Sequence, residues 1–269
     1  MKRDIETGLF LGRIPFARIG RGPETLLIIN GGQGFVMKPL PSMLEKDAGR
    51  FIRILPRDMS FVLIGYDPDP KADLSLEGMA EDIADIIDGN FKKPAWLMGV
   101  SYGGVVATQV AARYPDHVGK LILLASAYGF SADGKKRLQR QIQFAKAGEF
   151  HALLGEFTTV FRRPWLNLLL RFRLWFEGRR LIERMAATGS IVRYLEAVVD
   201  NDAAKEDLRN ISARSLIIGG ERDQFFGSGM MEATASSIRE AKLMVLDKET
   251  HMVPVERASD IRKYLQEFI

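Results

Sequence analysis

The chain has no cysteine among its 269 residues, so it can form no disulfide bond and offers no thiolate to a metal ion. Histidine is also scarce, and three residues scattered along the sequence argue against a histidine-based metal centre. No long apolar run is present, and residues 1–6 lead into no sustained hydrophobic stretch. We therefore expect no metal, no other cofactor, no secretory signal, no transmembrane segment and a cytoplasmic location.

Internal repeats, low-complexity tracts and nucleic-acid-binding motifs are missing as well. The net charge of +4 is not accompanied by base-reading or stacking motifs, so we expect no nucleic-acid partner. Apolar residues make up 46% of the chain, which at this length is enough for one large core. Apolar strands alternate with helical runs, and this alternation indicates an α/β fold with a mostly parallel, doubly wound sheet.

The most informative motif is Gly-Val-Ser-Tyr-Gly at residues 99–103. An apolar run at 96–98 precedes it and a helical run at 104–112 follows it. A strand, Gly-x-Ser-x-Gly and a helix in this order form a nucleophile elbow. The turn requires small neighbours and exposes the hydroxyl of Ser101 beside the positive end of the helix.

A base and an acid follow later in the chain. Residues 215–220 read as a buried strand that leads to Asp223, and residues 242–246 read as the next strand, which leads to His251. The carboxyl ends of parallel strands open on one edge of the sheet, so these loops can converge on Ser101. The serine hydroxyl needs a base during attack, which His251 can supply, and Asp223 would orient the imidazole.

Other residues compete weakly for these roles. His117 comes just after a helix and His151 lies in a helical segment, so neither follows a late strand. Glu221 is the main rival to Asp223 as the acid, and Asp247 is too close in sequence to His251.

Acyl transfer also requires donors for the developing oxyanion. One is expected to be the backbone N–H of Tyr102, immediately after the nucleophile. The second is expected in the glycine-rich loop at residues 30–35, which follows the third strand at 26–29. Gly32 is the first choice for this N–H, and Gln33 is the possible alternative.

With these motifs the chain resembles the α/β-hydrolase superfamily, in the branch with a helical cap after the sixth strand. The resemblance covers nearly all of the chain and implies an eight-stranded sheet, with a core at 1–127 and 208–269 and a cap at 128–207. Family members usually have His-Gly where this chain has Asn30 and Gly31. Residues 30–34 are also similar, with two changes, to the His-Gly-Gly-Pro-Gly motif of proline iminopeptidases.

The cap region carries most of the positive charge. Residues 131–200 contain 13 lysines and arginines and 7 acidic residues, a net charge of +6. Eight arginines dominate it: Arg162, Arg163, Arg171, Arg173, Arg179, Arg180, Arg184 and Arg193. A solvated helix face is the simplest interpretation, and attraction of an anionic substrate or a membrane surface is the alternative.

Large apolar residues lie among these arginines: Trp165, Leu168, Leu169, Phe172, Trp175 and Phe176. Such side chains usually pack a cap onto the body of the protein. They could instead line an apolar acyl pocket or enter lipid head groups.

Together these patterns predict a serine hydrolase that cleaves a small or medium carboxylic ester with an apolar flank through an acyl-enzyme. The partner would be a small acyl substrate, anionic or apolar, and the protein a monomer or homodimer. A serine at the elbow argues against haloalkane dehalogenase and epoxide hydrolase chemistry. A carbon–carbon bond hydrolase for an anionic ring-cleavage product, an aminopeptidase, a cofactor-free perhydrolase and a slow-turnover ligand-binding or signalling member remain alternatives.

Overall fold

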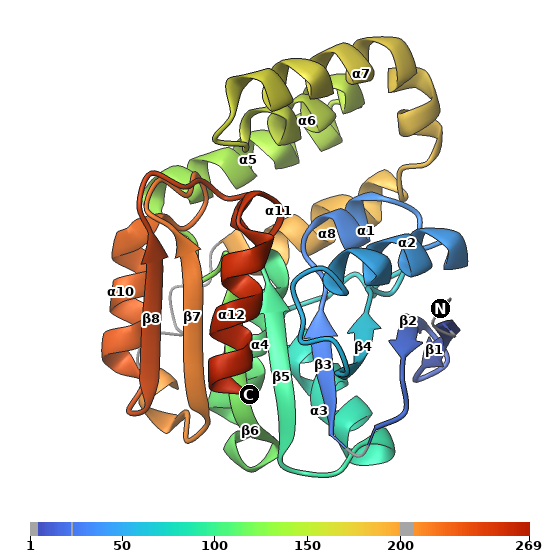
Figure 1. The fold of residues 1–269 in the computed structure, drawn as a ribbon. Helices are drawn as coiled ribbons and strands as arrows, with labels where there is room; N and C mark the ends of the chain where they lie inside the picture. The colour runs from blue at the N-terminus through green and yellow to red at the C-terminus, as the bar shows by residue number, and fades with distance from the viewer. Residues whose placement is uncertain (1–4, 23, 200–206) are drawn as a thin grey trace.

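The computed structural model describes residues 5–22, 24–199 and 207–269, and its centre is a sheet of eight strands (Figure 1). The strands are β1 (Ile5–Phe10), β2 (Ile14–Ile19), β3 (Thr25–Ile29), β4 (Ser60–Ile64), β5 (Ala95–Val100), β6 (Val118–Leu124), β7 (Arg214–Gly220) and β8 (Ala241–Leu246). Their order is β1-β2-β4-β3-β5-β6-β7-β8. The β1–β2 and β2–β4 pairs are antiparallel and the other pairs are parallel, which confirms the predicted mostly parallel sheet.

Helices cover both faces of this sheet, as a doubly wound fold requires. One face carries α3 (Leu76–Asn90), α4 (Tyr102–Arg113) and α10 (Gly227–Ser237), and the other carries α2 (Pro41–Phe51) and α12 (Ala258–Phe268). Consecutive residues of a strand point to opposite faces. Leu27 therefore belongs to the first core and Ile28 to the second. The central strands are continuous apolar runs because both of their faces are buried.

Between β6 and β7 the described chain is helical. This region contains α5 (Ala132–Lys146), α6 (Phe150–Glu156), the 3₁₀ turn η2 (Phe157–Thr159), α7 (Pro164–Glu183) and α8 (Thr188–Val199). In Figure 1, α5, α6 and α7 extend beyond the sheet, with α7 farthest from it, and α8 returns toward α1 (Gln33–Val36). Part of the predicted cap, residues 200–206, lies outside the described residues, and the domain division at 128 and 207 stays a prediction.

The apolar residues of α7 correct one expectation. Six of them are between 55 and 71% exposed: Trp165, Leu168, Leu169, Phe172, Trp175 and Phe176. The buried residues of α7 are Leu174 and Gly178, on the other side of the helix. These side chains therefore do not pack the cap onto the body, and they give no basis for an apolar flank in the substrate. None of the described helices combines the length and apolar content that crossing a membrane requires.

Candidate active site

Ser101 lies between β5 and α4 in a strained backbone conformation, with φ 52° and ψ −123°. A positive φ is unfavourable for a residue with a side chain and persists only where the surroundings hold it. Here the N–H of Ser101 donates to the carbonyl of Leu124 at 3.0 Å. The carbonyl of Ser101 accepts from the hydroxyl of Ser126 at 2.7 Å. The end of β6 and the residues just after it thus fix both backbone groups of the serine.

The glycines around Ser101 are required by close backbone approach. A Cβ atom on Gly99 would overlap the backbone of Gly103 and Gly104, and one on Gly103 would overlap the backbone of Ile29. This confirms that the tight turn needs small neighbours. It also packs the start of α4 against the end of β3, so the elbow lies beside the glycine-rich loop.

The structure brings Ser101, His251 and Asp223 together in one hydrogen-bonded chain. Ser101 Oγ lies 2.9 Å from His251 Nε2, and His251 Nδ1 lies 2.8 Å from Asp223 Oδ2. The other carboxylate oxygen, Asp223 Oδ1, accepts the backbone N–H groups of Phe225 at 2.8 Å and Phe226 at 3.0 Å. Asp223 is buried, and these two amides fix the direction in which its free oxygen meets the imidazole.

Gln224 and Phe225 also hold His251, and apart from their position next to Asp223 no sequence pattern indicates this role. The side-chain oxygen of Gln224 accepts the backbone N–H of His251 at 3.2 Å. The ring of Phe225 lies 4.7 Å from the imidazole, centre to centre. One short loop after β7 therefore supplies the acid, an anchor for the histidine backbone and an apolar wall for its ring.

The competing residues lie elsewhere. Glu221 is exposed and accepts the backbone N–H of Lys248 at 2.9 Å, and Asp247 is exposed as well. The imidazole Nε2 of His117 lies 3.1 Å from a carboxylate oxygen of Asp88. His151 lies on α6 and is exposed. None of these four makes a hydrogen bond with Ser101 or His251 within the part of the chain that the structure describes.

The glycine-rich loop contains a helical turn where the sequence predicted only a loop. α1 begins at Gln33, with Gly32 as its N-cap in the helical conformation. The N–H groups of Phe35 and Val36 both bond to the carbonyl of Gly32, which closes this turn. A run of three glycines within four residues did not indicate a helix because glycine has a low helix propensity.

Two short backbone segments with free amides meet at Ser101. A Cβ atom on Gly31 would lie 3.5 Å from the Cβ of Ser101, so the loop passes close beside the serine. The N–H groups of Gly32, Gln33 and Tyr102 lie at the starts of α1 and α4. Within the described residues these amides have no hydrogen-bond acceptor. They are thus available to an anion, and their assignment as oxyanion donors stays a prediction.

Asn30 fixes the loop from inside, in the place where family members usually have histidine. Its side-chain oxygen accepts the N–H of Gly31 at 2.9 Å, and its own N–H donates to Ile64 at 3.1 Å. Its carbonyl accepts the hydroxyl of Tyr66 at 2.5 Å. The ring of Tyr66 belongs to a buried cluster with Phe35, Tyr102 and Tyr194.

Residues near His251 are also tied to the segment that leads into α7. The hydroxyl of Thr250 donates to the carbonyl of Val160 at 2.8 Å. Glu249 is buried between Arg162, at 3.0 Å, and Arg257, at 3.1 Å. The helical region between β6 and β7 is therefore fastened directly to the histidine loop.

A cavity of about 370 Å³ lies apart from the hydrogen-bonded residues Ser101, His251 and Asp223. Arg13, Asp67, Asp82 and Tyr194 are among its lining residues, whereas Ser101, His251 and Asp223 are not. Arg13 pairs with Asp67 at 3.0 Å and with Asp82 at 2.5 Å. Among the described residues, no group of three or more histidine, aspartate or glutamate side chains could hold a metal ion.

Comparison with known proteins places these features in context. A family model described as alpha/beta hydrolase fold matches residues 64–258. Monoacylglycerol lipase abhd6-B of Xenopus laevis is 26% identical over 237 residues, which cover 81% of this chain and 69% of the relative. Proline iminopeptidase PfmaB of Pestalotiopsis fici is 25% identical over 271 residues, which cover 91% and 94%. An alpha/beta hydrolase enzyme from a Medee basin deep-sea metagenome library has the same fold, with a TM-score of 0.79, 17% identity and coverage of 98% and 96%.

Proposed function

The chain belongs to the alpha/beta hydrolase family and is an enzyme of the hydrolase class, and we propose that it cleaves carboxylic esters of small or medium acyl size. The observation that carries the proposal is the unbroken hydrogen-bonded chain from Ser101 through His251 to Asp223. A serine in this setting is an activated nucleophile, and an ester is a carbonyl substrate that such a nucleophile attacks readily.

Acylation begins when Ser101 Oγ attacks the ester carbonyl while its proton passes to His251 Nε2. Asp223 Oδ2 accepts the hydrogen bond of Nδ1–H, which keeps Nε2 free to act as the base and stabilises the imidazolium. The negative charge that develops on the carbonyl oxygen is met by the N–H of Tyr102 and by that of Gly32 or Gln33. The N-terminal ends of α1 and α4 add their partial positive charge.

The tetrahedral intermediate collapses when the carbon–oxygen bond to the alcohol breaks and His251 returns its proton to the leaving oxygen. A water molecule then attacks the acyl-enzyme with His251 again as the base, and the carboxylic acid leaves as Ser101 recovers its proton. No step requires a metal or another cofactor.

The charges near the site favour esters over peptides with a free amino terminus as substrates. An aminopeptidase needs a free carboxylate to hold the substrate amine. Asp67 and Asp82 are near the aromatic cluster, but both are paired with Arg13. The cap region is basic, which favours a neutral or anionic substrate over a cation. The lipase relative acts on an ester by its name, and this is consistent with the same choice.

The test is the hydrolysis of a series of p-nitrophenyl esters of increasing acyl length by wild type, three active-site variants and one control variant. Ser101→Ala and His251→Ala should each lower kcat by about 10⁴-fold or more, and Asp223→Asn by a factor of about 10³ to 10⁴. Glu221→Gln is the matched control, because Glu221 is an exposed acid two residues from Asp223 that touches neither Ser101 nor His251, and its rate should equal wild type.

The same assay distinguishes the alternatives. Hydrolysis of a vinylogous diketone acid with esters left intact would assign carbon–carbon bond cleavage in place of ester hydrolysis. Release of proline from proline p-nitroanilide with esters left intact would assign an aminopeptidase. The proposal would be contradicted if folded wild-type protein hydrolysed none of these substrates above the rate of Ser101→Ala. That result would favour a ligand-binding role.

A further inference from the structure

We propose that the outer face of α7, which consists of Trp165, Leu168, Leu169, Phe172, Trp175 and Phe176, docks onto an anionic lipid surface. Ten large apolar side chains are exposed among the described residues, and six of them form this face. Steps of three and four residues place all six on one side of the helix. A contiguous exposed patch of this kind marks an interaction site, whereas single exposed apolar residues do not.

The aromatic members of the face are packed on one another. The rings of Phe172 and Trp175 lie 4.5 Å from the ring of Phe176, which stands between them. Tryptophan and phenylalanine are the residues by which amphipathic helices enter the boundary between lipid head groups and acyl chains. Tryptophan in particular prefers this boundary, since its ring is apolar and its N–H is polar.

The charge around the face is positive and largely unpaired. Residues 162–184 contain seven arginines and two glutamates, with no lysine or aspartate. Arg171, Arg179, Arg180 and Arg184 are exposed and form no ion pair with any described residue. Guanidinium groups bind phosphate oxygens through two parallel hydrogen bonds, so these arginines suit anionic head groups. Each basic residue near an anionic bilayer adds to binding.

A second copy of the chain fits this face less well. Two such faces in contact would bring their arginines together, and like charges at an interface oppose association. The net charge of +5 over residues 162–184 thus favours an anionic surface over self-association. The position of α7 agrees with this choice, because it is the helix farthest from the sheet in Figure 1 and nothing in the described chain covers it.

The outer face contributes little to holding α7 in place. The inner side of the helix is fixed by Leu174 and by Gly178, which lies against His151 of α6. The start of the helix is fixed by Asn167, whose amide exchanges hydrogen bonds with the backbone of Phe161, and by the N–H of Arg162, which donates to Glu256 at 2.8 Å. Substitutions on the outer face are therefore expected to leave the fold intact.

The test is co-sedimentation of the full chain with vesicles of phosphatidylcholine alone and of phosphatidylcholine mixed with phosphatidylglycerol. Wild type should bind the anionic vesicles and should be released by salt, because screening weakens the attraction of the arginines. The double variant Phe172→Ser and Trp175→Ser should bind about a hundredfold more weakly, since each aromatic side chain contributes about a factor of ten. The double variant Leu9→Ser and Leu40→Ser is the matched control, because both leucines are exposed elsewhere, and it should bind like wild type.

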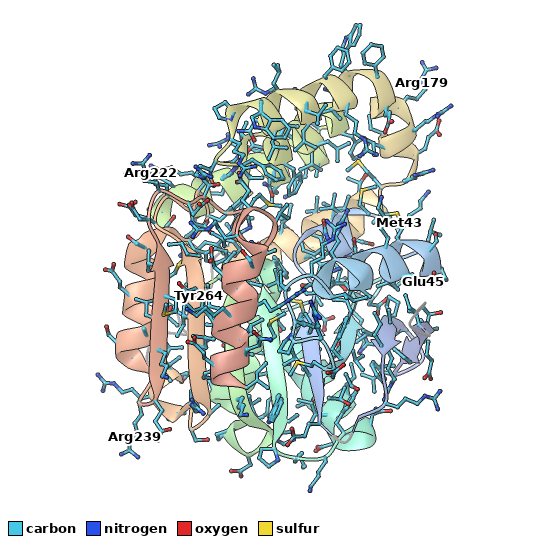
Figure 2. The ribbon with its side chains drawn as sticks, in the orientation of Figure 1. Met43, Glu45, Arg179, Arg222, Arg239 and Tyr264 are labelled. Atoms are coloured by element: carbon cyan, nitrogen blue, oxygen red, sulfur yellow. The ribbon has the colours of Figure 1, made fainter. Side chains whose placement is uncertain are left out.

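Charge is tested separately. Arg179→Glu should weaken binding to anionic vesicles by about tenfold or more, and Arg239→Glu should not. Arg179 lies at the α7 end of the molecule and Arg239 at the opposite end (Figure 2). Two of the three tryptophans lie on the outer face, so the fluorescence of wild type should shift to the blue when anionic vesicles are added.

Lipid docking does not depend on the proposed ester hydrolysis. Ser101→Ala should bind vesicles like wild type, and the outer-face variants should hydrolyse a soluble short ester at the wild-type rate. Failure of wild type to bind anionic vesicles would overturn the docking proposal, as would equal binding to both kinds of vesicle or full binding by the Phe172 and Trp175 double variant. A concentration-dependent dimer in lipid-free solution that this double variant abolishes, with no vesicle binding, would assign the face to a second copy instead.

Discussion

The hydroxyl of Tyr66 donates a 2.5 Å hydrogen bond to the carbonyl oxygen of Asn30. Asn30 is the first residue of the glycine-rich loop that lies beside Ser101, so this bond joins the segment just after β4 to the candidate oxyanion loop. The side chain of Asn30 bonds to the next amide, that of Gly31, at 2.9 Å. The backbone carbonyl and the side-chain oxygen of Asn30 thus both take part in holding the loop.

Tyr66→Phe should therefore lower kcat by more than its loss of unfolding free energy accounts for. It leaves the buried carbonyl of Asn30 without its donor, which costs about 1–3 kcal/mol of unfolding free energy, and it should lower kcat by about tenfold as the loop loosens. Tyr194→Phe is the matched control, because its hydroxyl bonds to the carbonyl of Asp67 at 2.9 Å, outside the loop. Urea unfolding and ester kinetics on both variants give the comparison, and equal kcat values would contradict the positioning role of Tyr66.

Thr250→Val should release the segment before α7 from the histidine loop. The substitution preserves shape and removes the hydroxyl that bonds to Val160. We expect a loss of about 1 kcal/mol in the free energy of unfolding and faster amide hydrogen exchange in residues 157–163. Thr7→Val, on the first strand, serves as the control and should leave exchange there unchanged. Unaltered exchange in the Thr250 variant would mean that the arginine pairs of Glu249 suffice to hold the segment.

Gly99→Ala should prevent normal folding, because its Cβ would overlap the backbone of Gly103 and Gly104. Neither neighbour is a flexible side chain that could move aside. The matched control is Gly89→Ala in α3, where a Cβ meets open space and should stabilise the helix by about 0.5–1 kcal/mol. Soluble yield and thermal unfolding distinguish the two, and a Gly99 variant with wild-type Tm would be incompatible with the close approach described above.

Alkaline pH should destabilise the protein through its buried tyrosines. Burial raises the pKa of Tyr66 and Tyr102 well above their ordinary value of 10.0, and the neighbouring tyrosines add to the effect. Because the pKa is higher in the folded than in the unfolded state, this contribution to stability is full below pH 10 and is lost as the pH rises above it. Each residue accounts for about 1.4 kcal/mol per pH unit.

This linkage is measured by urea unfolding at a series of pH values above 10. The dependence of unfolding free energy on pH should become less steep by about 1.4 kcal/mol per unit in Tyr102→Phe. Tyrosinate absorbance from these residues should develop only together with the loss of circular dichroism. An unchanged slope in the variant would show that Tyr102 ionises equally in both states.

Local sequence patterns were sufficient to predict the mostly parallel sheet and the convergence of Asp223 and His251 on Ser101. The strands of a parallel sheet are continuous apolar runs, and the glycines of residues 99–103 mark a turn that few other structures require. Once the strand order is known, the ends of β5, β7 and β8 lie on one edge, so Ser101, Asp223 and His251 can be predicted to converge.

Tertiary contacts between residues distant in the sequence could not be predicted in the same way. The helical turn at Gln33 exists despite its glycines because the loop is held by Asn30 and by the aromatic cluster. The apolar residues of α7 have the spacing of a buried face, and only the packing of the opposite side against α6 leaves them in solvent. Amphipathic spacing shows that a face is apolar and does not show what covers it.

Whether Ser101 is an activated nucleophile can be measured by reaction with a fluorophosphonate probe and mass-spectrometric mapping of the labelled peptide. Wild type should carry a single label on Ser101, and Ser101→Ala and His251→Ala should carry none although both variants remain folded. Folded wild type that is not labelled, or a label that persists in His251→Ala at the wild-type rate, would contradict the activation of Ser101.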